Sequence, residues 1–168
     1  MITRPVADKR DAIVGAWMGE ACAGIGAPAL GLGRDHDRFA CAESRTLSNC
    51  LPVLFDEIVG SMDRVRVAAA LDDILRIRAV QPIAPSCALG FILGLRRIIR
   101  EKVGSGPDSA AFLAFVDDRI DQLALQAFDS LVECREQIAR ARLEEVGRGR
   151  VILGRMRLPV LEEPGDVP

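Results

Sequence analysis

The sequence predicts an all-α protein: one helical domain of about five main helices, the last of them long. The chain has 168 residues, the length of one domain, and 49% of them are hydrophobic, which is enough to build a core. Only 4% are aromatic, so the core must come from Leu, Ile, Val and Ala. Apolar residues recur at spacings of three and four, as on one face of a helix, and no segment shows the alternation typical of a strand.

The first helix is predicted over residues 6–22, because its apolar residues share one helical face. This face carries Ile13, Val14, Trp17 and Met18.

A glycine-rich segment, GIGAPALGLGRDHDRFACAE (24–43), follows and is predicted to be a loop or linker. It lacks the preceding strand and the following Lys-Ser/Thr of a phosphate-binding loop. His36, the single histidine of the chain, falls among charged residues in this segment. We therefore expect it to be a surface residue rather than a haem ligand.

A second helix is predicted around residues 47–58, where apolar residues form a wide stripe. Pro52 lies inside the stripe, and proline removes a backbone donor and clashes with the preceding turn. We therefore expect the helix either to start near Asn49 or to kink at Pro52.

The third helix is predicted over residues 64–78, with Asp63 as its N-cap. Pro82 and Pro85 follow it, and they end the helix because a residue that precedes proline avoids helical angles. Pro85 itself suits the first position of a fourth helix, which is predicted to reach about residue 103.

The fourth helix opens with SCALGFILGL (86–95), which is apolar nearly all round, as expected of a helix enclosed on several sides. Gly90 and Gly94 share one face of it. Because glycine lowers helix propensity, we expect a second helix to approach these two positions closely.

The last helix is predicted over residues 109–145, with apolar residues at intervals close to a heptad seam. Either this helix spans the whole domain or its end packs on a partner chain, in which case Leu131, Cys134 and Ile138 form a dimer seam. We expect residues 1–150 to form the helical domain and residues 151–168 to form a C-terminal tail that is partly flexible.

The charge pattern argues against several classes of partner. The net charge of −2 argues against a general nucleic-acid or membrane-surface role, and the C-terminal arginines are interleaved with glutamates, as on a paired helix surface. The longest charge-free apolar run, residues 82–95, is shorter than the roughly 20 residues that cross a bilayer. No signal-peptide pattern opens the chain. We expect a cytoplasmic protein without nucleic-acid partners or membrane insertion.

The five cysteines are odd in number and include no C-x-x-C pair, so they form neither a disulfide framework nor a zinc signature. Cys41 and Cys50 flank Arg45, a cation that favours the thiolate, and are the candidates for a redox switch. In the alternative interpretation Cys50, Cys87 and Cys134 lie on apolar stripes as small core residues.

No set of residues supports catalysis, because the single histidine has no acid–base partner and the serines have no base. Asp117 and Asp121 have a spacing that suits a metal ion, but Arg119 lies between them. We interpret this stretch as a solvated helix face and expect no metal and no cofactor.

Three stretches carry a known pattern: DRFACAESRTLSNCLPVLFDEIV (37–59), RIRAVQPIAPSCALGFILGLRRIIREKV (76–103) and DDRIDQLALQAFDSLVECREQI (117–138). An Arg-Ala-Val-Gln ends one helix at Arg78 to Gln81, and a Pro-Ser opens the next at Pro85. Ala88, Phe91 and a basic helix end follow. In these features the chain, over roughly residues 38 to 146, resembles the RsbRD-type amino-terminal domain, named after stressosome co-antagonist proteins of the RsbR class.

The resemblance implies a globin-like fold without haem, a homodimer and a protein partner in a signalling or regulatory pathway. It also implies a set of ligand or partner contacts, namely Arg78, Gln81, Pro85, Ser86 and Phe91. Ser44-Arg45-Thr46 stands where the family often has Gly-His-Thr, so no role of that histidine carries over. No anti-sigma-antagonist-like domain follows, so we expect a stand-alone module.

The sequence thus predicts a non-enzymatic regulatory or sensory module. The alternative is a helical protein that binds a ligand or redox cofactor in a pocket between helices or through its cysteine thiols.

Overall fold

The helices expected from the sequence are present. The computed structural model describes residues 6–23, 35–104 and 106–155, and of residues 7, 35–41, 107, 108 and 149–155 it describes the backbone only. Its elements are η1 (Ala7–Lys9), α1 (Arg10–Ala23), α2 (Asp35–Val59), α3 (Arg64–Ala79), α4 (Pro85–Val103) and α5 (Pro107–Arg155). These described residues contain no strand, which confirms the all-α class and the long last helix.

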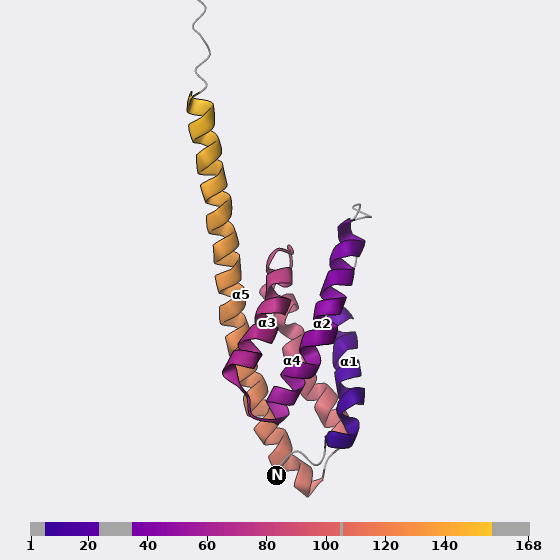
Figure 1. The fold of residues 1–168 in the computed structure, drawn as a ribbon. Coiled ribbons are helices and arrows are strands. Elements are labelled where there is room, and N and C mark those ends of the chain that lie inside the picture. The colour runs from indigo at the N-terminus through magenta and orange to yellow at the C-terminus, as the bar shows by residue number, and fades with distance from the viewer. Residues whose placement is uncertain (1–5, 24–34, 105, 156–168) are drawn as a thin grey trace, which may run out of the picture. The chain divides into compact units, whose positions relative to one another are not determined.

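The chain divides into two units, residues 1–135 and residues 136–168. Unit 1 contains α1 to α4 and the part of α5 that ends at residue 135. Within it, α2 packs along α3, and α1 packs against both α2 and α4 (Figure 1). This bundle fits the expected globin-like arrangement. The expected domain boundary at residue 150 stays a prediction.

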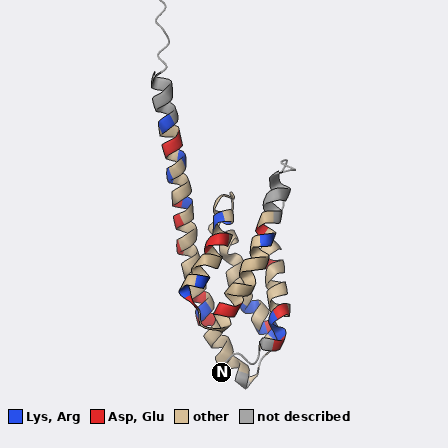
Figure 2. Ribbon diagram, viewed as in Figure 1, with Lys and Arg blue, Asp and Glu red and all other residues tan. Residues whose placement is uncertain are grey.

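The described part of unit 2 is the end of α5, where acidic and basic residues alternate (Figure 2). Arg140 pairs with Glu136 at 3.3 Å, and Arg148 pairs with Glu144 at 3.7 Å. Both pairs join residues four apart, which is the paired surface charge expected from the sequence.

The core of unit 1 is aliphatic with few rings, as the composition requires. Of the side chains that the structure describes, the buried rings are Trp17, Phe55, Phe91 and Phe112. The predicted stripe of α2 is buried throughout: Leu47, Cys50, Leu51, Leu54, Phe55 and Ile58. Burial of these side chains holds the helices together, because each Å² of apolar surface removed from water contributes about 25 cal/mol.

The prediction for α2 was wrong in its start. Residues 35–43, including His36, belong to this helix rather than to a loop, while residues 24–34 lie outside the described residues. All glycines of the predicted loop lie at or before Gly33, so nothing after that position breaks a helix. Helix α2 also continues through Pro52 and does not begin at Asn49, because its stripe is buried on both sides of the proline.

The prediction that α4 is enclosed on several sides was also wrong. Its inner face is buried through Ala88, Phe91, Ile92 and Leu95. Its opposite face, however, leaves Leu93 51% exposed. Cys87 is exposed as well and is not the core residue that the sequence suggested. The helix is therefore two-sided, with an unusually apolar outer face.

The two glycines of α4 differ in their surroundings. A Cβ atom at Gly94 would lie 1.8 Å from Oε1 of Glu20, so a side chain of α1 occupies that position. A Cβ atom at Gly90 would have no neighbour within 4 Å. Among the described residues, the expected close approach of a helix is thus absent at Gly90, and at Gly94 it is made by a side chain.

The ends of the helices follow the local rules predicted from the sequence. Asp63 caps α3 by accepting hydrogen bonds from the backbone N–H groups of Val65 at 2.9 Å and Arg66 at 3.0 Å. Pro85 opens α4 directly after Ala84. Helix α1 begins only at Arg10, after the short η1 turn, and α5 runs past residue 145 to Arg155.

A buried carboxylate organises the turn between α2 and α3. Oε2 of Glu57 accepts hydrogen bonds from the backbone N–H of Asp63 at 2.9 Å and from the hydroxyl of Ser61 at 2.8 Å, and Oε1 pairs with Arg66 at 2.9 Å. These donors, the Asp63 N–H first, favour the charged form and lower the pKa of Glu57 below its ordinary value.

Arg119 of α5 fastens this turn to the rest of unit 1. Its Nη1 donates to the backbone carbonyls of Glu57, Ile58 and Gly60 at 3.2, 3.0 and 2.6 Å. The carbonyls of Glu57 and Ile58 belong to the last turn of α2, where a cation is favoured, and that of Gly60 follows directly. The Glu57 carbonyl also accepts from the backbone N–H groups of Gly60 and Met62. The guanidinium also lies over the ring of Phe115, 4.1 Å from its centroid.

We predict that Glu57→Gln makes the fold less sensitive to acid. Because the pKa of Glu57 is lowered by folding, its charged form stabilises the protein above the ordinary value of 4.5, and this stability is lost as the pH falls below that value. Urea unfolding of both proteins from pH 7 to pH 3.5 measures the effect. We expect the variant to be less stable at pH 7 and to lose less on acidification, and parallel curves would contradict the assignment.

Candidate functional site

A buried arginine joins four helices at the centre of unit 1. Arg78, in the last turn of α3, is 1% exposed. Its Nε donates to Oε1 of Glu43 at 2.8 Å, its Nη1 to the carbonyl of Ala88 at 2.6 Å and its Nη2 to the carbonyl of Ala21 at 3.0 Å. These partners lie on α2, α4 and the end of α1, so one side chain ties all four helices together.

The partner carboxylate is equally buried and is held on both oxygens. Glu43 is 1% exposed, and its Oε2 accepts a hydrogen bond from Nε2 of Gln81 at 2.8 Å. A buried charge is tolerated only when it is paired and its remaining bonding capacity is used. Arg78, Glu43 and Gln81 together meet this requirement, and we call these three residues the buried hub.

Two aromatic rings border the buried hub. The guanidinium of Arg78 lies 4.4 Å from the ring centroid of Phe91 in a cation–π contact. Phe91 stacks on Trp17 with centroids 6.0 Å apart, and Nε1 of Trp17 donates to the carbonyl of Phe91 at 2.8 Å. The polar atoms at the centre of the bundle are therefore satisfied by one another.

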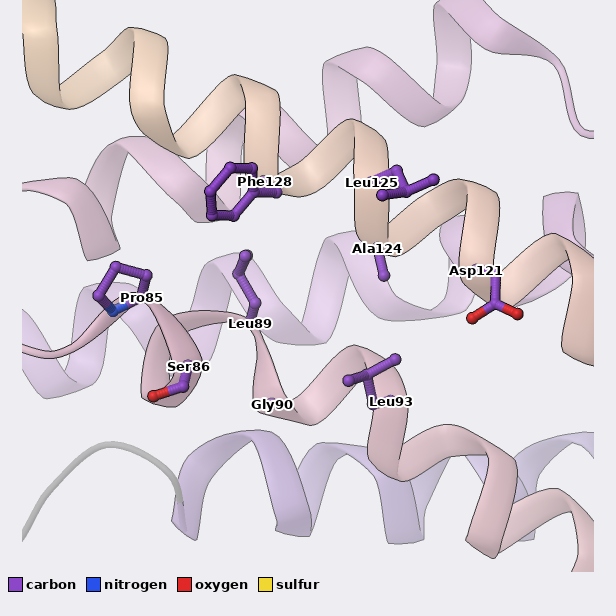
Figure 3. Close-up of a pocket in the computed structure, with 9 residues that line it drawn as sticks. All are labelled: Pro85, Ser86, Leu89, Gly90, Leu93, Asp121, Ala124, Leu125 and Phe128. Atoms are coloured by element: carbon purple, nitrogen blue, oxygen red, sulfur yellow. The ribbon is translucent and has the colours of Figure 1, made fainter.

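A surface groove lies between α4 and α5, away from the buried hub. Its volume is about 550 Å³. Figure 3 shows its two walls, with α4 on one side and α5 on the other. The lining residues are Pro85, Ser86, Leu89, Gly90, Leu93, Asp121, Ala124, Leu125 and Phe128.

The groove exposes large apolar side chains to water. Leu125 is 69% exposed and Phe128 is 50% exposed on α5, opposite Leu93 of α4. Contiguous exposed apolar surface of this kind marks a place where something binds. The groove is therefore the candidate functional site, and we call it the α4–α5 groove.

Ion pairs between α4 and α5 lie at the Asp121 end of the groove. Arg96 pairs with Asp121, and Arg100 pairs with Asp117. Arg96 also donates to the backbone carbonyl of Asp117 at 3.3 Å. The carboxylates of Asp117 and Asp121 thus face arginines. Within the described ranges, no three His, Cys, Asp or Glu side chains are grouped to hold a metal ion.

The predicted contact residues separate into two groups. Arg78 and Gln81 belong to the buried hub, and Phe91 borders it. Pro85 and Ser86 lie instead at the α4–α5 groove. Sequence reasoning missed Glu43, which it placed in a loop, and also Leu125 and Phe128. The pattern that could have revealed Leu125 and Phe128 is their apolar character at positions of α5 outside its buried stripe.

The residues of the predicted dimer seam occupy different surroundings. Leu131 is buried inside unit 1, and Cys134 is half-buried. The neighbouring Arg135 donates to the carbonyl of Ile83, so this face of α5 contacts the corner after α3. Ile138 belongs to unit 2 and is half-buried. Whether these residues contact a second chain stays a prediction.

The thiols are placed unevenly. Burial raises the pKa of Cys50, with a further contribution from the Asp73 carboxylate, and burial also raises the pKa of Cys134. Both effects favour the unreactive thiol. The side chain of Cys41 lies outside the described residues, so the redox pairing of Cys41 with Cys50 stays a prediction.

The fold and these two features define a class: a helical domain built around a buried ion pair, with an apolar surface groove. The family model described as "RsbT co-antagonist protein rsbRD N-terminal domain" matches residues 11–146. The chain belongs to this family, as the resemblance in its sequence suggested. No curated protein and no solved structure matches the chain. Across the described part of the chain, no helix is long and apolar enough to cross a membrane.

We predict that Glu43→Gln lowers the free energy of unfolding by about 3–5 kcal/mol, because it leaves the buried charge of Arg78 without an anion. The double variant Glu43→Leu/Arg78→Met should lose less free energy of unfolding than Glu43→Leu and Arg78→Met lose in sum as single variants. The reason is that the double variant removes both buried charges. Urea unfolding measures both effects.

Arg76→Ala is the matched control for this prediction. It breaks an exposed pair with Asp72, at 2.7 Å, on the same helix, and exposed pairs contribute about 0–1 kcal/mol. An equal loss in Arg76→Ala and Glu43→Gln would contradict the role of the buried hub.

We predict that alkylation at neutral pH modifies Cys87 rapidly and spares Cys50 until the protein unfolds. Cys87 is exposed, whereas Cys50 is buried and its pKa is raised. Iodoacetamide labelling followed by peptide mass spectrometry, with and without urea, gives the two rates. Equal rates in the folded protein would show that Cys50 is a reactive thiol after all.

Proposed function

We propose that this protein is a non-enzymatic regulatory module that works as a homodimer and couples a signal to a protein partner inside the cell. Membership of the family supports the regulatory class, since the family is named for co-antagonists of RsbT. By that likeness the partner is an RsbT-type protein or another component of the same regulatory assembly.

The observation that carries the proposal is the α4–α5 groove. Its residues Leu93, Leu125 and Phe128 are exposed although they are among the most apolar of the chain. Exposing them to water is unfavourable by about 25 cal/mol per Å², so a protein contact that covers them is strongly favoured. A surface of this kind suits protein–protein recognition better than chemistry on a substrate, because it holds almost no polar groups.

The centre of the bundle supports the same conclusion. Helical bundles that bind a cofactor hold it in their interior, among side chains of several helices. Here Arg78, Glu43 and Phe91 occupy the interior position at which four helices meet, and they bond to one another. Signalling through contacts at the surface fits a centre whose described polar groups bond to one another.

The alternative function is a carrier of an apolar ligand, and the volume of the α4–α5 groove favours it. About 550 Å³ is within the range of small-molecule sites, but this groove is open and holds only Ser86 and Asp121 as polar side chains. We rank it second because orientation of a small ligand depends on several convergent polar groups.

We predict that the freshly purified full chain sediments as a dimer at micromolar concentration. Covering the apolar groove supplies the driving force for the association. Sedimentation velocity over a hundredfold range of concentration tests this, and native mass spectrometry of the same sample reports bound molecules. A monomer throughout the range would refute the dimer, and a monomer with added mass would favour the ligand carrier.

A further inference from the structure

We propose that α1 is a strap that opens before the rest of unit 1 unfolds, losing its helical turns and withdrawing Trp17 from the ring of Phe91. The inference goes beyond the proposed function, because it depends on neither a dimer nor a partner. Helix α1 packs on α4 from the side of the buried inner face (Figure 1). Its opening therefore uncovers a surface that the closed form hides.

Helix α1 buries few of its side chains. Of its 14 residues Ile13, Trp17 and Ala21 are buried, whereas α3 buries seven of 16 and α4 buries six of 19. Isolated helices of up to about 15 residues are marginal in water, so a helix of this length depends on burial to stay formed. Elements with few buried apolar contacts are also those that open at the smallest cost. Of these three helices, α1 is therefore the one held most weakly.

Two glycines weaken α1 further. Gly15 and Gly19 lie in the interior of the helix on its exposed side, and no described atom lies within 4 Å of a Cβ built at either position. Packing therefore does not require glycine there. Glycine in the interior of a helix is less favourable than alanine, because it loses more backbone entropy when the helix forms. The two glycines thus favour the open form and leave the contacts of the closed form unchanged.

The buried hub allows α1 to leave without separating charges. Helix α1 gives the guanidinium of Arg78 a backbone carbonyl, that of Ala21, at 3.0 Å from Nη2. The charge of Arg78 is balanced by Glu43 of α2 at 2.8 Å, and this ion pair does not involve α1. When α1 opens, the carbonyl and Nη2 bond to water and the ion pair stays. Departure of α2 would instead leave a buried charge without its counterion, which is costly.

The ion pairs of α1 with its neighbours lie at the surface. Arg10 pairs with Asp56 of α2 at 2.7 Å, and Glu20 pairs with Arg97 of α4 at 2.8 Å. All four side chains are partly exposed, and exposed pairs contribute little because water screens them. These pairs therefore guide α1 into place more than they hold it there.

Opening of α1 uncovers the face of α4 that carries Phe91. In the closed form Trp17 stacks on Phe91 and donates from Nε1 to its carbonyl at 2.8 Å. In the open form this ring and carbonyl face water, beside the guanidinium of Arg78. The two forms thus present different surfaces, and any molecule that binds one of them better shifts the equilibrium toward it.

Hydrogen exchange of the full chain under native conditions tests the order of opening. Peptide mass spectrometry follows the amides of α1, α3 and α4 in the same sample at one protein concentration. We expect the amides of α1 to be protected at least tenfold less than those at the centres of α3 and α4. Equal protection of the three helices would overturn the inference, because α1 would then open only when all of unit 1 unfolds.

Gly15→Ala combined with Gly19→Ala tests the role of the glycines. Each alanine meets no described atom and favours the helix, so each should slow the exchange of the α1 amides about fivefold, and both together at least tenfold. Gly147→Ala is the matched control, because Gly147 is also helical, exposed and without described neighbours within 4 Å, but lies in α5. It should leave exchange in α1 unchanged. If the double variant does not slow the exchange, α1 does not lose its helix on opening and the inference is overturned.

Trp17, the single tryptophan of the chain, reports its own separation from Phe91. We expect its fluorescence to shift to longer wavelength at a urea concentration at which the amides of α3 still exchange as in the native protein. The double alanine variant should need more urea for this shift, and Gly147→Ala should not. A shift that comes only with the loss of protection in α3 contradicts the strap. None of these measurements reports the oligomeric state, so the inference and the proposed function fail or stand separately.

Discussion

The arrangement of unit 1 depends on the buried ion pair between Arg78 and Glu43. The guanidinium bonds to α2 through Glu43 and to the carbonyls of Ala21 and Ala88, so moving any one of four helices leaves a buried charge or carbonyl unpaired. Such a pair contributes little net stability compared with an apolar substitute, but breaking it from one side is costly. Its main effect is therefore to fix one relative placement of the helices.

The corner formed by Pro82 and Pro85 allows α3 and α4, which follow each other in the chain, to take this placement. Arg78 lies in the last turn of α3, and Ala88 lies in the first turns of α4, so the two ends of the corner meet at one guanidinium. Gln81, between them, reaches the other oxygen of Glu43. The family pattern of Arg-Ala-Val-Gln followed by Pro-Ser thus has a structural meaning: Arg78 and Gln81 hold Glu43, and Pro85 starts the helix that returns to them.

This corner also makes α4 two-sided. Phe91 points toward the buried hub, which orients the helix so that Gly90 and Leu93 lie on its outer face beside α5. The buried interior and the α4–α5 groove are consequently opposite faces of the same helix.

The sequence by itself determined the helices. Their apolar spacing, the Asp63 cap and the start at Pro85 depend only on residues that are close together in the sequence. Its resemblance to the family also singled out Arg78, Gln81 and Phe91 as ligand or partner contacts, and their places in or beside the buried hub came from the structure. Only the tertiary structure decided that Glu43, 35 positions from Arg78, is the buried counterion, and that no neighbour among the described residues lies within 4 Å of a Cβ at Gly90. Periodicity tells which residues share a face of a helix, but the neighbour of that face is chosen by packing between segments distant in sequence.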